Sequence, residues 1–147
     1  MNKIVLLITI LFFIFSGCST NDKESKKLEE DINSLLSQIV VELKTPQKVT
    51  LSPRTFIELN AILIASNYLW TKELIKSETN ISSEMLEKYR EVKRKELLSM
   101  FGITIEDFEN YSIKNYQSLK SFSDQNPNLM EKYNELSRML PTLFENY

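Results

Sequence analysis

Apolar residues recur at three- and four-residue intervals along most of this chain, which is the pattern of helices that bury one face. The first such helix is predicted from about Glu24 to Lys44. Its apolar stripe comprises Leu28, Ile32, Leu35, Leu36, Ile39, Val40 and Leu43. Its opposite, polar face comprises Glu29, Glu30, Asn33, Ser37 and Lys44. Thr45-Pro46 is predicted to end this helix, because proline disfavours helical geometry in the residue before it.

A second helix is predicted from Pro53 to about Ser77, with Ser52 as its N-cap and proline at its first position. Its apolar residues cover most of its circumference. They are Phe56, Ile57, Leu59, Ala61, Ile62, Leu63, Ile64, Ala65, Tyr68, Leu69 and Trp70. A helix that is apolar nearly all round is buried, so we expect this one at the centre of the fold.

The third helix is predicted to begin at the cap Ser82 and to close at Gly102, which suits the left-handed position after a helix. Its predicted buried face comprises Met85, Leu86, Tyr89, Val92, Leu97, Met100 and Phe101. On its surface, Glu84 with Lys88 and Glu91 with Lys95 have the spacing of favourable ion pairs.

Two further helices complete the pattern. Thr104 and Asp107 form a capping-box motif before a fourth helix from Ile105 to about Ser123. Its predicted inward residues are Phe108, Tyr111, Leu119 and Phe122. Asn126-Pro127 is predicted to start the fifth helix, which Pro141 ends. Short connections between amphipathic helices indicate an all-α fold, an antiparallel bundle of about five helices over residues 24–147.

The first eighteen residues have a different pattern. A basic start is followed by twelve residues, Ile4 to Phe15, with only Thr9 polar, and then by Ser16-Gly17-Cys18. This is the composition of a secretory signal peptide, and the run is shorter than the roughly 20 residues that a spanning helix needs. An uncleaved anchor or an ordinary secretory signal is the alternative.

The segment from Met1 to Ser19 resembles the signal peptides of bacterial lipoproteins, whose motif ends in a small residue and then cysteine. The resemblance implies that residues 1–17 are removed, that Cys18 carries a diacylglycerol and that its new amine is acylated. Residues 18–23 would then be a lipid-anchored tether. Phe15 stands where the family usually has leucine. Ser19 stands where aspartate would favour the inner membrane, so the outer membrane is the expected location.

Composition excludes several kinds of chemistry. The chain has no histidine, one cysteine and two glycines. Ser-His-Asp and Cys-His catalysis, metal sites built from His or Cys, and a Gly-rich phosphate loop are therefore excluded. Removal of Lys3 with the leader would leave 17 basic against 20 acidic side chains, which argues against a nucleic-acid partner. We expect no cofactor, no metal and no catalytic residue.

Two features are candidates for contact with a partner. The basic stretch of Lys88, Arg90, Lys93 and Arg94 could bind anionic lipid, lipopolysaccharide or an acidic protein. The alternative, which we favour, is a solvated face whose cations pair with neighbouring glutamates. Tyr116 lies off the apolar stripe of its helix and is the aromatic residue we expect to be exposed.

Polar residues within the second helix allow two interpretations each. Glu58 could act as a general acid together with Glu106 or Asp107, or it could face solvent or pair with Arg54. Asn60, Asn67 and Thr71 share one face. If buried, they would need partners and could line a polar pocket. We favour a glutamate that faces solvent or pairs with Arg54, and an exposed polar strip.

The helical part resembles the small lipid-anchored helical domains of bacteria, through Phe101–Phe108 and Asn126–Leu129. The sequence therefore predicts a lipid-anchored, non-enzymatic protein of the bacterial cell envelope that offers a helical surface to a protein partner. One alternative is a surface-exposed lipoprotein that contacts a host or another cell. The other is a hydrolase of cell-wall glycans that uses only carboxylates.

Overall fold

The computed structural model describes residues 22–77 and 80–139, and every regular element in these ranges is an α-helix. The six helices are α2 (Asp22–Ile39), α3 (Pro53–Ser77), α4 (Ser83–Met100), α5 (Ile105–Lys114), α6 (Tyr116–Gln125) and α7 (Pro127–Met139). The all-α class is confirmed. The predicted leader, Cys18, most of the tether and the C-terminal tail lie outside the described residues.

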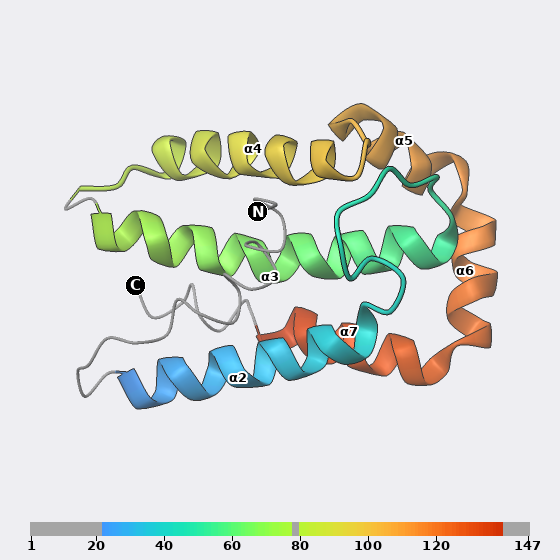
Figure 1. Cartoon of the computed structure of the whole chain (residues 1–147), viewed down its shortest axis with the longest axis horizontal. Coiled ribbons are helices and arrows are strands. Elements are labelled where there is room, and N and C mark those ends of the chain that lie inside the picture. The colour runs from blue at the N-terminus through green and yellow to red at the C-terminus, as the bar shows by residue number, and fades with distance from the viewer. Residues whose placement is uncertain (1–21, 78–79, 140–147) are drawn as a thin grey trace.

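Helix α3 is the central element of the fold, as predicted from its apolar circumference. Figure 1 shows α4 on one side of it and α2 with α7 on the other, and all three contact it. Leu59, Ala61 and Ala65 on α3 have no exposed surface. Apolar burial of this kind stabilises a fold by about 25 cal/mol per Å², so α3 holds the bundle together.

Helix α2 ends at Ile39, five residues earlier than predicted. Its apolar stripe is confirmed, since Ile32, Ile39 and Leu43 are almost completely buried. Beyond Val40, however, the backbone N–H groups of Glu42 and Leu43 donate to the carboxylate of Glu58 on α3, each at 2.9 Å. Two tertiary hydrogen bonds to Glu58 therefore take the place of the last predicted turn of the helix, and α2 ends well before Pro46.

The connection between α4 and α5 follows the predicted capping pattern. Gly102 has a φ of 71°. The N–H of Gly102 donates to Ser99 O and that of Ile103 donates to Leu98 O, at 3.0 and 3.1 Å. This pair of bonds is the Schellman motif, which needs a left-handed residue that glycine adopts without strain. The turn is thus defined by backbone geometry at a single glycine.

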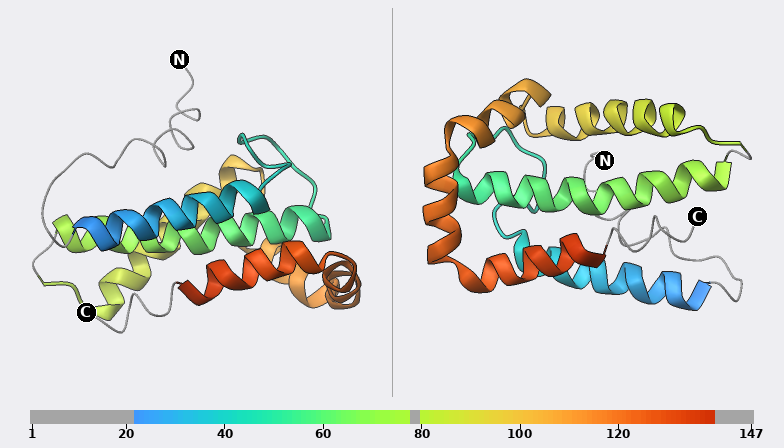
Figure 2. Two further views of the ribbon diagram at one scale, coloured as in Figure 1. Left: turned by 90° about the horizontal axis from the view of Figure 1, so that it is seen from below. Right: turned by 180° about the vertical axis from the view of Figure 1, so that it is seen from behind.

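The predicted fourth helix is divided in two. Asn115 separates α5 from α6 with φ −113° and ψ 22°, and its side-chain amide donates to Tyr111 O at 3.1 Å. Asparagine side chains hydrogen-bond nearby backbone groups in competition with the helical pattern, which favours a break at this position. The break lets α6 turn across the end of the bundle and lead into α7 (Figures 1 and 2).

The predicted buried face of α4 is partly wrong. Met85 and Val92 are 44% and 57% exposed, whereas Leu97 and Leu98 are buried. Positions three to four residues apart share a helix face. Arg94 lies one turn before the two leucines and Arg90 lies two turns before them, so both arginines are on the same face of α4. The N-terminal half of α4 therefore contacts α3 through Arg90, whereas Met85 and Val92 are exposed to solvent.

Candidate functional site

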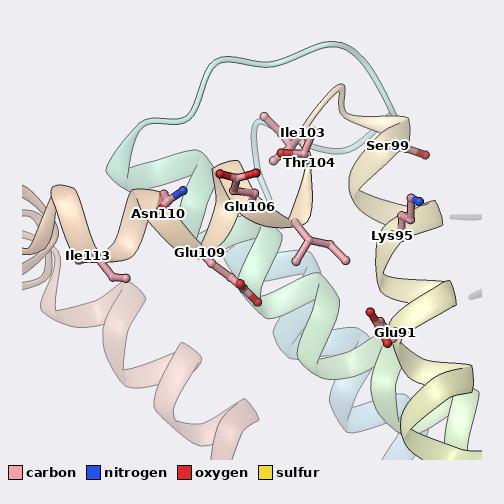
Figure 3. Close-up of a pocket in the computed structure, with 10 residues that line it drawn as sticks. Glu91, Lys95, Ser99, Ile103, Thr104, Glu106, Glu109, Asn110 and Ile113 are labelled. Atoms are coloured by element: carbon pink, nitrogen blue, oxygen red, sulfur yellow. The ribbon is translucent and has the colours of Figure 1, made fainter.

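A groove of about 680 Å³ lies between α4 and α5. One wall is formed by Glu91, Lys95 and Ser99 of α4. The turn and α5 supply Ile103, Thr104, Ile105, Glu106, Glu109, Asn110 and Ile113. Figure 3 shows these side chains on the two helices, on either side of the depression. The volume lies within the roughly 300–1,000 Å³ of ligand-binding clefts.

The turn that connects the two walls of the groove ends in an N-cap of α5. Thr104 Oγ1 accepts from the N–H of Asp107 at 3.0 Å and donates to Asp107 Oδ2 at 2.7 Å. The predicted cap is confirmed, although the aspartate accepts from the hydroxyl and not from the backbone of Thr104. Together with the Schellman motif, this cap holds α5 at a set angle to α4. The groove is therefore preformed by backbone geometry.

The groove combines apolar and acidic groups. Ile103 is buried and Ile105 is half-buried, whereas Ile113 is 76% exposed. Three lining residues are glutamates and one is a lysine. Glu109 pairs with Arg94 of α4, with Nη1 3.2 Å from Oε1. The predicted pair of Glu91 with Lys95 is not formed within the part of the chain that the structure describes.

Most of the basic stretch on α4 is engaged by neighbouring side chains. Lys88 pairs with Glu84 at 2.7 Å, as its spacing predicted, and Lys93 lies 3.5 Å from Glu96. The guanidinium of Arg94 also lies over the ring of Phe108. Arg90 donates to Thr71 Oγ1 from Nε and Nη2, at 3.1 and 2.7 Å. Contact of these four residues with a partner stays a prediction.

Glu58 is a buried structural group in this fold. It has no exposed surface, and its Oε1 accepts from Arg54 Nε at 2.6 Å. Its Oε2 accepts the two backbone N–H groups of the α2–α3 loop, and Arg54 Nη2 also donates to Ile39 O at 3.0 Å. Glu106 and Asp107, the predicted partners of an acid mechanism, are both exposed on α5. The paired interpretation of Glu58 is therefore the one that the geometry supports.

Other polar residues of α3 connect it to neighbouring helices and do not form an exposed strip. Thr71 is buried and accepts from Arg90 of α4, while the amide of Asn60 donates to the hydroxyl of Tyr133 on α7 at 2.7 Å. Lys72 forms an ion pair with Glu29 of α2, which is buried and not exposed as predicted. Sequence periodicity did not reveal that Glu29 is buried, because the lysine that pairs with it lies on another helix.

No candidate metal site is found among the described residues. They contain no group of three or more Asp, Glu, His or Cys side chains arranged to hold a metal ion. In the same ranges, each buried side-chain nitrogen or oxygen has a hydrogen-bond partner. Among the described helices, none combines the length and apolarity that crossing a bilayer requires. Tyr116 is 63% exposed, as expected.

Three tyrosines have raised pKa values, and in Tyr111 the cause is burial. Burial, together with the hydrogen bond from its hydroxyl to Glu73, raises the pKa of Tyr89 to about 12. Burial raises the pKa of Tyr133, and a hydrogen bond with Ser137 partly offsets this. Because burial disfavours the phenolate forms, ionisation of these tyrosines should lower the stability of the fold at alkaline pH.

The shift at Tyr89 makes stability depend on alkaline pH. Its contribution should be complete below the unfolded pKa of 10.0 and should be lost as pH rises towards 12. Urea unfolding measured between pH 9 and pH 11 should therefore show a steeper loss of stability in the wild type than in Tyr89→Phe. Parallel losses in the two proteins would show that this phenol is not perturbed.

Comparisons of the chain with protein-family models, curated protein sequences and solved structures gave no match.

Proposed function

We propose that this protein is a lipid-anchored, non-enzymatic component of the bacterial cell envelope that offers a helical surface to a protein partner. The observation that carries the proposal is the N-terminal segment, in which a basic start and twelve mostly apolar residues end at Ser16-Gly17-Cys18. Acylation of Cys18 would anchor the domain, because two acyl chains already give stable binding to a bilayer. Position 19 is serine and not the aspartate that, in lipoproteins, would favour the inner membrane, so we propose the outer membrane as the location.

The shape of the helical domain supports this arrangement. Helix α2 begins at Asp22, only four residues after Cys18, so an acylated cysteine would keep this end within about 14 Å of the bilayer. The junction of α4 with α5, which forms part of the groove, lies towards the opposite end of the long axis (Figure 1). Helix α3, which runs between these two ends, has 25 residues and a length of about 37 Å. The groove would thus face away from the membrane.

The polar groups of the domain support a binding role over a catalytic one. The one buried carboxylate on α3, Glu58, already accepts three hydrogen bonds. The groove, by contrast, presents an exposed isoleucine among charged side chains. An apolar side chain bordered by charged groups matches the apolar centre and polar rim of protein interfaces.

Mass spectrometry of the intact protein purified from envelopes tests the anchor. We expect a chain that begins at Cys18 and carries a diacylglycerol thioether and an acylated amine. Treatment with alkali should release the ester-linked acyl chains and leave the amide-linked one. A chain that retains residues 1–17 and a bare thiol at position 18 would reject the proposal.

A further inference from the structure

The α4–α5 groove has the chemistry of a site for a basic amphipathic helix. We propose that it binds a helix of a partner protein that carries apolar residues on one face and lysine or arginine along the edges of that face. This inference rests on the proposed function and deepens it by naming the chemistry of the partner. Three features of the groove support it.

The first feature is an apolar surface without cover. Ile113, at 76%, is the most exposed large apolar residue in the described parts of the chain. It lies eight residues after Ile105 on α5, about 80° around the helix axis, so both fall within the roughly 100° of one helix face. Both line the groove. Apolar side chains of a docked helix, spaced at i, i+3 or i+4 and i+7, would cover them.

The second feature is charge. Glu91 on one wall and Glu106 on the other are exposed, and neither forms an ion pair among the residues that the structure describes. Figure 3 places them on the two helices that flank the depression. With Glu109 and Lys95, the lining has an excess of acidic groups. Cations along both edges of a docked helix would complement these carboxylates, whereas anionic lipid would be repelled.

The third feature is size. Helix α5 has ten residues and a length of about 15 Å. A docked helix of two to three turns would therefore cover the whole wall. The cap at Thr104 and the turn at Gly102 hold the walls in place before binding, which lowers the entropy cost of docking. The groove is suited to a short helix with two or three apolar anchors.

Binding of a synthetic helix to the full chain in phosphatidylcholine nanodiscs tests the assignment. The probe is a fluorescein-labelled 18-residue peptide of leucine and lysine, with leucine at i, i+3, i+4 and i+7. The control peptide replaces each lysine by glutamate. Fluorescence anisotropy, corrected for empty nanodiscs, should show binding of the lysine peptide that weakens as salt is raised, and at least about tenfold weaker binding of the glutamate peptide.

Two charge-matched variants locate the site. Glu91→Lys with Glu106→Lys reverses both edges of the groove, whereas Glu131→Lys with Glu135→Lys makes the same charge change on exposed positions of α7. We expect the first variant to weaken binding of the lysine peptide at least about tenfold and the second less than about twofold. Ile113→Ser should also weaken it, by about tenfold. Circular dichroism of each variant checks that the fold is retained.

Several results would overturn the assignment. Equal losses in the two charge-reversed variants would mean that the peptide binds through net charge alone. Equal affinity for the glutamate peptide would exclude a cationic partner. Self-association that is lost in the groove variant, without peptide binding, would identify a second copy as the occupant. Failure of peptide binding by a protein with acylated Cys18 rejects the groove assignment alone, whereas binding by a chain with a bare thiol rejects the envelope anchor alone.

Discussion

Replacing Glu58 by alanine is expected to lower the free energy of unfolding by about 3–5 kcal/mol. The side chain is completely buried, and its removal would leave the N–H groups of Glu42 and Leu43 without their acceptor. It would also leave the guanidinium of Arg54, which is 24% exposed, without its carboxylate. Because domains of this size have total stabilities of about 5–15 kcal/mol, the variant should be partly unfolded at 37 °C.

Urea unfolding followed by circular dichroism measures this effect. A matched control is Glu84→Ala, which removes a glutamate from an i,i+4 ion pair in which both side chains are more than 70% exposed. This change should cost less than about 1 kcal/mol, because exposed pairs are screened by water and salt. A loss below about 1 kcal/mol for Glu58→Ala as well would show that the α2–α3 loop does not depend on this carboxylate.

Replacing Leu98 by alanine is expected to lower the free energy of unfolding by about 2–5 kcal/mol. Leu98 has no exposed surface and belongs to the hydrophobic core formed with α2, α3 and α7. Truncation removes buried methyl groups and leaves a cavity that the surrounding helices fill only in part. The measurement is again the urea midpoint, with the m-value checked for a constant unfolded state.

Val92→Ala on the same helix is the matched control for this variant. The valine is 57% exposed, so its truncation should change stability by less than about 0.5 kcal/mol. The pair is informative because apolar periodicity alone placed Val92 on the buried face and left Leu98 out. If Val92→Ala proves the more destabilising of the two, α4 is rotated relative to the arrangement described above.

The local signals in the sequence predicted the ends of helices better than their packing. Ser82 accepts from the N–H of Met85 and Gly102 adopts the left-handed conformation, both as expected. These features depend on bonds between residues three to five apart, which a short stretch of sequence specifies by itself. The same signals did not reveal where α2 ends, because the groups that end it are held by Glu58, fifteen or more residues away.

The candidate groove could be predicted only in part. Its turn, from Gly102 to the cap at Thr104, was recognisable from residue type. Its walls were not, because the depth of a groove depends on the angle between two helices and on which side chains fill the space between them. Ile113 was not singled out from the sequence, and only its exposure in the folded chain distinguishes it from a core isoleucine.

The sequence by itself determined an all-helical fold, the central position of α3 and the caps of α4 and α5, since apolar periodicity and capping chemistry are local properties of the chain. Tertiary structure alone decided that Glu29 and Glu58 are buried, that Val92 is exposed and that α5 and α6 part at Asn115. The burial of the two glutamates depends on partners supplied by distant segments, Lys72 for Glu29 and the α2–α3 loop for Glu58. Burial of a charge is favourable only when that partner is brought into contact, and only folding does so.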